Sequence, residues 1–303
     1  MSDAIITNRP AGAPAPQRAT PPRGFRDATA ESRATRLTLI AISLLGMAVL
    51  VFAPLVTVFA EALADGIAAA LASLAHKDAL SAIRLTLIIT AIALPVNAAF
   101  GIAAAWLITK FDFRGKAFLI TLIDLPFSVS PVVAGLCIVL LFGANSVVGG
   151  WLVAHGFPIV FAIPGIVLAT VFVTFPFVAR ELIPVMIEQG RAEEEAALTL
   201  GASGWRTFRT VTLPNIRWAL LYGTLLCTAR AMGEFGAVAV VSGKIRGKTA
   251  TMPITIEMLY NEYLSVAAFS MAALLTALAL LTLMLKTGLE LRHADQLAAT
   301  RRH

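Results

Sequence analysis

The chain alternates between long apolar runs and shorter polar connections. Six runs, at roughly 38–60, 82–108, 117–142, 160–180, 217–241 and 264–288, are long enough to span a bilayer, because a helix needs about 20 apolar residues to cross the hydrocarbon. The runs show no alternating strand period, and backbone polar groups cannot stay unpaired in lipid. The pattern therefore predicts an all-α fold, a polytopic membrane bundle with six transmembrane helices.

Composition agrees with a membrane bundle. The 303 residues are 58% hydrophobic and only 14% charged, whereas a soluble domain of this size needs more polar surface. The net charge of +6 would suggest nucleic acid as a partner of a soluble protein. Here the basic residues lie mostly in the connections, where they orient the chain in the membrane. We therefore expect membrane lipid, and no nucleic acid, as a partner.

The basic residues also predict the topology. They gather in the N-terminal tail, the second and fourth connections and the C-terminus, which all fall on one side of a six-span bundle. That side should be the cytoplasm, so both termini are expected there. The fifth connection is an exception, because Lys244, Arg246 and Lys248 fall outside. We expect a disordered cytoplasmic tail at 1–36, a permease domain at 37–290 and a cytoplasmic C-terminal tail at 291–303.

The third run is irregular. The stretch DLPFSVSPVVAGL contains Pro126 and Pro131, which remove two backbone donors and should break or kink the helix. Such a break can line a transport pathway, with Ser128 and Ser130 as candidate pathway residues, or it can simply shape packing. Asp124, just before the break, could cap the broken segment or line the path.

Two opposite charges fall near the middle of the fifth run. Arg230 and Glu234 are four residues apart and should share one helix face. A lone charge at that depth is costly, so we expect the two to pair and to face the bundle interior. Arg230 could offer positive potential to a crossing dianion, while Glu234 keeps that charge from becoming a trap. The alternative is a static pair that holds this helix against a neighbour.

The fourth connection, 181–215, is long and patterned, and contains EEEAALTLGASGWRTFRTVTLPN. Pro184 and Gly190 should interrupt the helix that enters it. A first short helix should begin at three glutamates, which favour the positive end of the helix dipole, and should end at Gly201 in a left-handed cap. A second should begin at Ser203 and stop at Pro214, unless Pro214 starts the next helix.

Two such helices would form a small protruding knob. Small residues, among them Ala196, Ala197 and Gly201, would let another backbone approach closely. The knob could dock a cytoplasmic protein or rest on lipid headgroups as an amphipathic loop. Acidic residues sit badly against an anionic leaflet, which favours a protein partner.

The spacing of this segment resembles a known motif. Glu195-Ala196-Ala197, three residues, Gly201, nine residues, Val211, and then Leu213-Pro214 is similar to the EAA motif of ABC-importer permeases. In that family the segment forms a coupling helix that fits a groove on the ATPase subunit. The resemblance implies an ATPase-coupling role for the following residues of this chain: Glu195, Ala196, Ala197, Leu198, Gly201, Leu213 and Pro214.

The resemblance extends over roughly residues 36–290. SPVVAGL, FVTFPFVARELIPVM, ARAMGEFGAVAVVSG and SGKIRGKTATMPITIE together resemble the sulfate/thiosulfate importer permeases, most of all the W-type subunit. This implies the MetI-like fold of type I importers, in a bacterial inner membrane. It also implies a homologous T-type permease, a dimer of ATPase subunits and a periplasmic sulfate/thiosulfate-binding protein as partners. Molybdate and phosphate permeases share the motif, so another oxyanion remains the alternative.

Other function classes find little support in the sequence. There is no GxxxxGK[ST] loop, so ATP-Mg is expected on the partner ATPase, and no cofactor is expected in this chain. No catalytic constellation is visible, and the four histidines are too dispersed to suggest a metal site. Cys137 and Cys227 fall within expected spans, where a thiol usually acts as a small buried hydrophobe. A self-sufficient channel or ion-coupled carrier would predict inverted repeats or a string of acids, and neither is visible.

Overall fold

A computed structural model of the protein describes residues 32–300, and the regular elements within that range are all helices. In chain order they are α1 (Arg33–Ala62), α2 (Ile67–Leu74), α3 (Lys77–Lys110), α4 (Lys116–Ser128), α5 (Pro131–Phe142), α6 (Val147–Ala154), α7 (Ile163–Gln189), α8 (Ala192–Thr199), α9 (Gly204–Thr207), α10 (Leu213–Met232), α11 (Gly236–Val241), α12 (Met252–Asn261) and α13 (Ser265–Thr300). A π-helical turn, Phe208–Thr212, joins α9 to α10. The all-α prediction is confirmed.

The chain divides into two units inside α1, between Ala53 and Pro54. The described part of the first unit is the beginning of α1, and the second unit holds the remaining elements. The expected tail 1–36 lies outside the described residues up to 31, and its last four residues are already helical because α1 begins at Arg33. At the other end, α13 continues to Thr300, well into the expected tail 291–303. Good helix formers such as Leu297 and Ala298 favour that extension.

Several helices are long and apolar enough to cross a membrane. Within the described residues these are α1 from Ala34 onward, α3, α7 and α13 as far as Gly288. Helices α4 and α5 make a fifth if they are counted as one span. The fifth expected span, 217–241, coincides with α10 and α11, which are shorter and interrupted. The membrane-bundle architecture is confirmed, and the count of six spans stays a prediction.

Proline acts differently at two of the expected breaks. Between α4 and α5 the axis turns by 108° at Val129–Ser130, so the break in the third run is confirmed. Pro131 starts α5, where its missing N–H is not needed. The expected interruption at Pro184 is wrong, because α7 continues through it to Gln189. Leu182 and Met186 are buried on either side of Pro184, and their packing outweighs one lost backbone hydrogen bond.

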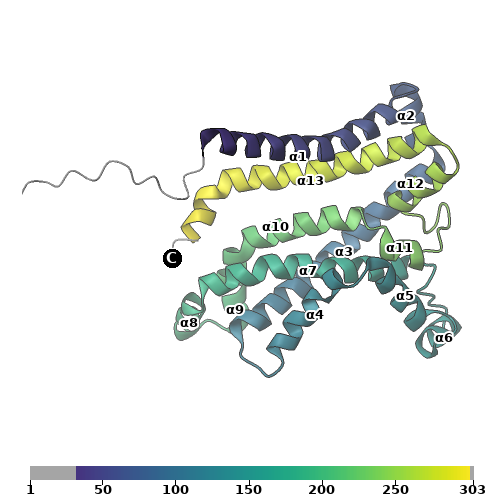
Figure 1. The fold of residues 1–303 in the computed structure, drawn as a ribbon. Helices are drawn as coiled ribbons and strands as arrows, with labels where there is room; N and C mark the ends of the chain where they lie inside the picture. The colour runs from purple at the N-terminus through teal and green to yellow at the C-terminus, as the bar shows by residue number, and fades with distance from the viewer. Residues whose placement is uncertain (1–31, 301–303) are drawn as a thin grey trace, which may run out of the picture. The chain divides into compact units, whose positions relative to one another are not determined.

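The centre of the second unit is the close packing of α3, α7 and α10, which run alongside one another in Figure 1. Val178 of α7 is fully buried between two glycines. A Cβ added to Gly101 of α3 would lie 2.6 Å from a Val178 methyl carbon, and one added to Gly223 of α10 would lie 3.2 Å from the Val178 Cα. The absence of side chains at these two positions lets both helices approach α7.

A polar layer lies one helical turn from Val178. The Asn97 amide of α3 donates to Thr174 Oγ1 of α7 at 2.7 Å and to Cys227 Sγ of α10 at 3.3 Å. All three side chains are fully buried, so these bonds join the three helices away from solvent. Cys227 is thus buried as expected, whereas Cys137 is exposed on α5, which corrects the expectation that both thiols are buried.

The two ends of the second unit carry different elements. Helices α8 and α9 lie at one end, and α6 and α11 lie at the other, where α11 packs against α5 (Figure 1). Gly135 of α5 makes the α5–α11 contact close. A Cβ there would lie 2.7 Å from the Ala237 carbonyl oxygen and 3.0 Å from the Ala237 Cα. Because these neighbours are backbone atoms, they cannot move aside as a flexible side chain can.

Replacing this glycine tests the contact. We expect Gly135→Ala to lower the free energy of unfolding by about 1–3 kcal/mol, because overpacking forces backbone shifts. Thermal unfolding of the detergent-solubilised protein measures the change. Gly288→Ala in α13 is the control, since an added Cβ there meets no atom within 4 Å. Equal unfolding temperatures for the two variants would contradict the close α5–α11 contact.

Candidate functional site

Helix α8 begins and ends as its residue types direct. Three glutamates occupy its first turn, where carboxylates interact favourably with the free N–H groups. At the other end Gly201 has φ +87°, in the left-handed region. The Gly201 N–H donates to the Leu198 carbonyl, and the Ala202 N–H donates to the Ala197 carbonyl, each at 3.0 Å. These two bonds make a Schellman cap, so the expected end of this helix at Gly201 is confirmed.

The second helix of the segment differs from expectation. It begins as predicted, because Ser203 Oγ accepts a hydrogen bond from the Arg206 N–H at 3.4 Å. It does not stop at Pro214: α9 leads through the π-helical turn into α10, and Pro214 lies in the first turn of α10. This is the alternative that the sequence left open for Pro214, since a proline in a first helical turn lacks only a donor that has no partner there. The knob is therefore α8 packed beside the start of a long helix.

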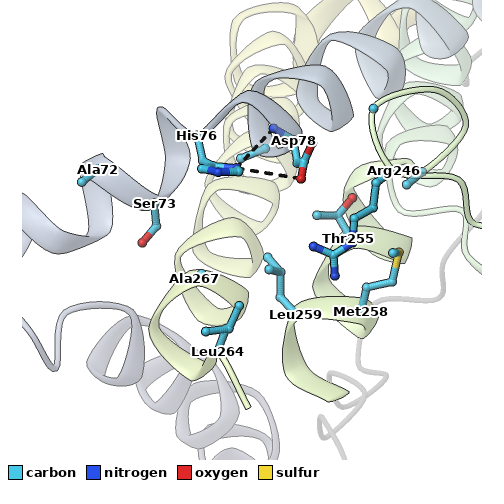
Figure 2. Close-up of a pocket in the computed structure, with 13 residues that line it drawn as sticks. Ala72, Ser73, His76, Asp78, Arg246, Thr255, Met258, Leu259, Leu264 and Ala267 are labelled. Atoms are coloured by element: carbon cyan, nitrogen blue, oxygen red, sulfur yellow. Dashed lines mark hydrogen bonds and ion pairs between the residues drawn. The ribbon is translucent and has the colours of Figure 1, made fainter. Parts of the chain in front are cut away.

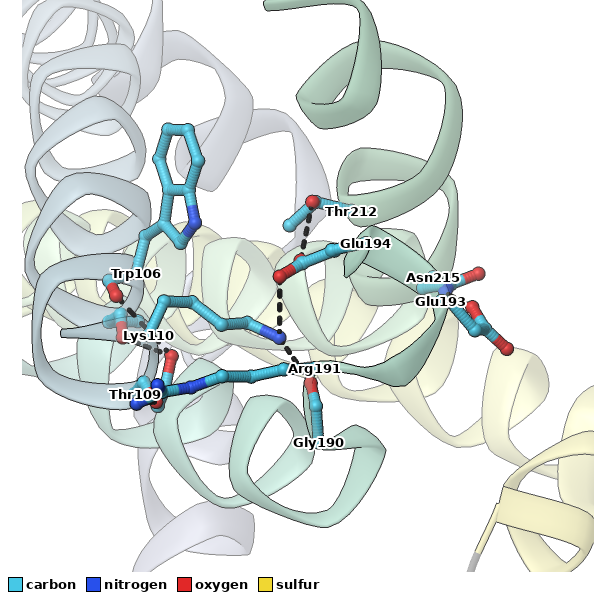
Figure 3. A network of polar contacts seen from close by, with 10 residues as sticks. Trp106, Thr109, Lys110, Gly190, Arg191, Glu193, Glu194, Thr212 and Asn215 are labelled. Atoms are coloured by element: carbon cyan, nitrogen blue, oxygen red, sulfur yellow. Dashed lines mark hydrogen bonds and ion pairs between the residues drawn. The ribbon is translucent and has the colours of Figure 1, made fainter. Parts of the chain in front are cut away.

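Two of the three glutamates hold α8 against the bundle. Glu194 accepts a hydrogen bond from Thr212 Oγ1 at 2.6 Å and lies 3.1 Å from Lys110 Nζ at the end of α3. Glu193 accepts from the Asn215 amide near the start of α10. Figure 3 shows Lys110, Glu194 and Thr212 close together, with Glu193 and Asn215 apart from them. Glu195, the first residue of the EAA-like motif, is exposed instead.

Sequence reasoning did not identify Lys110 and Thr212 as partners of α8. Lys110 contributed only to the predicted topology, as one of several basic residues in the second connection. Its partner Glu194 is 84 positions away in the chain, and no local spacing rule connects residues so far apart. A lysine at the end of a helix is a weak indication of a distant partner, because such lysines commonly interact with the last carbonyls of their own helix.

The motif residues fall into an exposed group and a packed group. Glu195, Ala196 and Leu198 of α8 are exposed, as is Gly201 in its C-terminal cap, and Ala197 is half-buried. Leu200 and Trp205 beside them are 89% and 71% exposed. Leu213 packs against the central core, whereas its neighbour Pro214 is exposed. The knob thus presents an apolar surface at the end of the bundle, and Leu213 ties the motif to the helices.

Arg230 and Glu234 form the expected ion pair, with Nη1 and Oε2 2.6 Å apart. The expectation that the two residues share one helix face is wrong, because α10 ends at Met232 and Glu234 lies in the break before α11. The buried Glu234 also accepts the Ala237 N–H at 2.9 Å through Oε1, so it caps the first turn of α11. Arg230 is half-buried, which leaves part of its guanidinium accessible.

The two helix breaks lie next to each other. A Cβ added to Gly236, at the start of α11, would lie 3.0 Å from the Pro131 Cβ at the start of α5. The α4–α5 break, with exposed Ser128 and Ser130, therefore neighbours the α10–α11 break that holds Glu234. The structure brings the two broken segments together but shows no direct bond between either serine and the ion pair.

Asp124 does not cap the broken segment, which corrects one of its two expected roles. It lies within α4, and its Oδ1 accepts from Arg180 Nε of α7 at 2.9 Å. The Arg180 guanidinium also lies over the Phe127 ring, 4.8 Å from its centroid. The pair fastens α4 to α7, and capping was wrong because the helix continues for four residues beyond Asp124.

The end of the second unit away from α8 and α9 holds a cavity of about 370 Å³ (Figure 2). Its lining comes from the α2–α3 junction, the loop before α12, α12 itself and the start of α13, and includes His76, Asp78 and Arg246. Arg246 pairs with Glu262, and Lys244 pairs with Glu257 at 2.6 Å. Two of the three basic residues that were an exception to the predicted topology are therefore neutralised within the chain.

Known proteins are similar in sequence to most of this chain. The family described as "Binding-protein-dependent transport system inner membrane component" matches residues 97–292. The sulfate transport system permease protein CysW of Escherichia coli (strain K12) is 54% identical over 258 residues, which cover 85% of this chain and 89% of that protein. The sulfate transport system permease protein CysT of the same strain is 37% identical over 208 residues, which cover 69% of this chain and 75% of that protein.

A solved structure shares the fold. The bacterial alginate ABC transporter in complex with alginate pentasaccharide-bound periplasmic protein has a chain that superimposes with a TM-score of 0.70. The match covers 86% of this chain and 94% of that chain at 15% sequence identity. This chain and that chain of the ABC transporter therefore share one fold.

Gly201 offers a test of the knob's own structure. Alanine at φ +87° is strained although space is free around it, so we expect Gly201→Ala to destabilise the cap by about 1 kcal/mol. Hydrogen exchange at the amides of residues 201 and 202 should accelerate about fivefold as the Schellman bonds open more often. Gly204→Ala is the matched control, since that glycine has neither positive φ nor close neighbours. Unchanged exchange in Gly201→Ala would contradict the cap.

Proposed function

The chain belongs to the family of binding-protein-dependent transport system inner membrane components, and on that premise we propose that it is the W-type permease subunit of an ATP-driven sulfate/thiosulfate importer. The observation that carries the substrate class is the 54% identity to a sulfate permease over most of both chains. Molybdate or phosphate as the anion, and a self-sufficient channel or carrier, are not favoured by this similarity.

The knob is the proposed coupling element. Its exposed apolar residues, Leu198, Leu200 and Trp205, form a protruding surface on α8 and α9. In water such a surface is best explained by a protein partner. The EAA-like residues Glu195, Ala196 and Gly201 lie on it, and a groove on an ATPase subunit is the partner that the motif implies. ATP-Mg would be bound and hydrolysed by that partner.

The proposed translocation pathway passes the two adjacent helix breaks. Irregular backbone at membrane depth is tolerated where it lines a cavity. Arg230 would attract the dianion, and Glu234 would limit its affinity, because a site must release its anion to transport it. Ser128 and Ser130, exposed at the neighbouring break, would supply hydroxyl groups. The alternative role of the ion pair, fastening α10 to α11, uses the same contacts.

The proposed assembly joins this chain to a homologous T-type permease. The 37% identity to CysT supports two related permease chains in one complex. A dimer of ATPase subunits would bind at the knob, and a periplasmic sulfate/thiosulfate-binding protein would deliver the anion at the opposite end. This places α8, α9 and both termini in the cytoplasm of a bacterial cell, with membrane lipid around the bundle.

Reconstitution tests the proposed substrate. The complex of both permeases and the ATPase is placed in liposomes, and ATP hydrolysis is measured with binding proteins loaded with sulfate, thiosulfate, molybdate or phosphate in turn. We expect stimulation by the sulfate- and thiosulfate-loaded proteins, because delivery from the loaded protein drives the conformational cycle. Stimulation by molybdate or phosphate alone would reassign the anion, and hydrolysis without any transport would contradict an importer.

Leu200 offers a test of the coupling surface. We expect Leu200→Asp to reduce co-purification of the ATPase subunit at least about tenfold, because a charge replaces an apolar group in the docked interface. Leu264→Asp is the control: it makes the same change at an exposed leucine just before α13. Equal recovery of ATPase with both variants would show that the knob is not the docking element.

A further inference from the structure

The two-residue junction between α7 and α8 contains a glycine in an unusual conformation. Gly190 has φ +66° and ψ −153°, a conformation that residues with a side chain rarely adopt. Helix α7 ends one residue before it, and α8 begins two residues after it. A junction this short fixes the separation of two helices, but their mutual angle depends on further contacts.

Lys110, the last residue of α3, bridges that junction. Its ammonium group donates a hydrogen bond to the Gly190 carbonyl and lies 3.1 Å from Glu194 Oε2 (Figure 3). One cation thus holds both the junction itself and the first turn of α8. Helix α3 is not adjacent to the knob along the chain, since α4 to α7 lie between α3 and α8.

The pair is sheltered and fully engaged. The side chains of Lys110 and Glu194 are only 7% and 16% exposed, so solvent and salt screen their attraction weakly. The second carboxylate oxygen of Glu194 accepts the Thr212 hydroxyl at 2.6 Å. Glu194 is therefore held from α3 on one side and from the π-helical turn before α10 on the other.

A second connection between α3 and the knob is weaker. Arg191 lies 3.4 Å from the Thr109 carbonyl and 3.7 Å from Asp112. Both charged side chains are largely exposed, and exposed ion pairs contribute little. The Lys110–Glu194 pair is the stronger of the two links.

We propose that Lys110 and Glu194 are the positioning pair that transmits displacement of α8 to α3, and through α3 to the packed α3–α7–α10 core. This inference rests on the proposed function, in which an ATPase moves α8. Without the pair, α8 could swing at Gly190 while α3 stays in place, and ATP hydrolysis would continue without the matching movement of the bundle.

The test uses the full complex of both permeases, the ATPase and the binding protein in liposomes. The measured quantity is sulfate transported per ATP hydrolysed. We expect Lys110→Met to lower this ratio about tenfold, the size expected for the loss of one charge-assisted hydrogen bond. Glu194→Gln, which retains an acceptor for Thr212, should have the same effect. Lys110→Arg, which keeps the charge and its donors, should stay near the wild-type ratio.

Lys116→Met is the matched control. Lys116 pairs with Asp112 at 3.4 Å near the same end of the bundle, but the lysine and aspartate side chains are 35% and 82% exposed. The same chemical change at this exposed pair should leave the transport ratio unaltered. If Lys110→Met fails to accumulate, Glu194→Gln carries the test, because the glutamine has almost the shape of the glutamate.

Three results would overturn the role of the pair. An unchanged ratio in both Lys110→Met and Glu194→Gln would show that α8 moves α3 by another route. Loss of the ATPase subunit from either variant would assign the pair to docking instead of transmission. A wild-type complex that neither binds an ATPase nor moves an anion would remove the proposed function and this role with it, and the wild-type measurement separates that outcome from the other two.

Discussion

The contact on which the rest of the second unit depends is the seating of Val178 between Gly101 and Gly223. In a membrane, apolar side chains gain little from meeting one another, so close backbone approach and interhelical hydrogen bonds must hold helices together. The two glycines permit that approach, and Asn97 supplies hydrogen bonds to both neighbouring helices one turn away. Either contact alone would stabilise the bundle only a little. Together, the glycine contacts of Val178 and the hydrogen bonds of Asn97 fix both the spacing and the rotation of α3, α7 and α10.

Everything assigned to coupling is attached to those three helices. Helix α7 leads into the knob, α10 leads out of it, and α3 ends beside it at Lys110. The knob therefore meets the three central helices at one point, through Gly190, Thr212 and Lys110. A rigid core with all three ends gathered at a small protruding element is suited to convert a push on that element into a movement of the whole bundle.

The features that were predictable from sequence are local ones. Pro131 and its neighbours broke the third run because a missing donor acts within one turn, and Gly201 ended α8 because left-handed backbone favours glycine. Pro184 did not interrupt α7, because burial of Leu182 and Met186 is a tertiary effect that propensity does not contain. The partners of Asp124 and Glu194 were missed for the same reason, since each pair joins helices distant in the chain.

The π-helical turn before α10 has a consequence for how this protein can vary. Such a turn holds one residue more than an α-helical turn would, and each residue of an α-helix corresponds to a rotation of about 100°. The wider turn takes up its extra residue locally, so the residues on either side keep their orientation about the α10 axis instead of being turned by that angle. Chain length can therefore change by one residue within this turn without rotating the knob, which a regular α-helix would not permit.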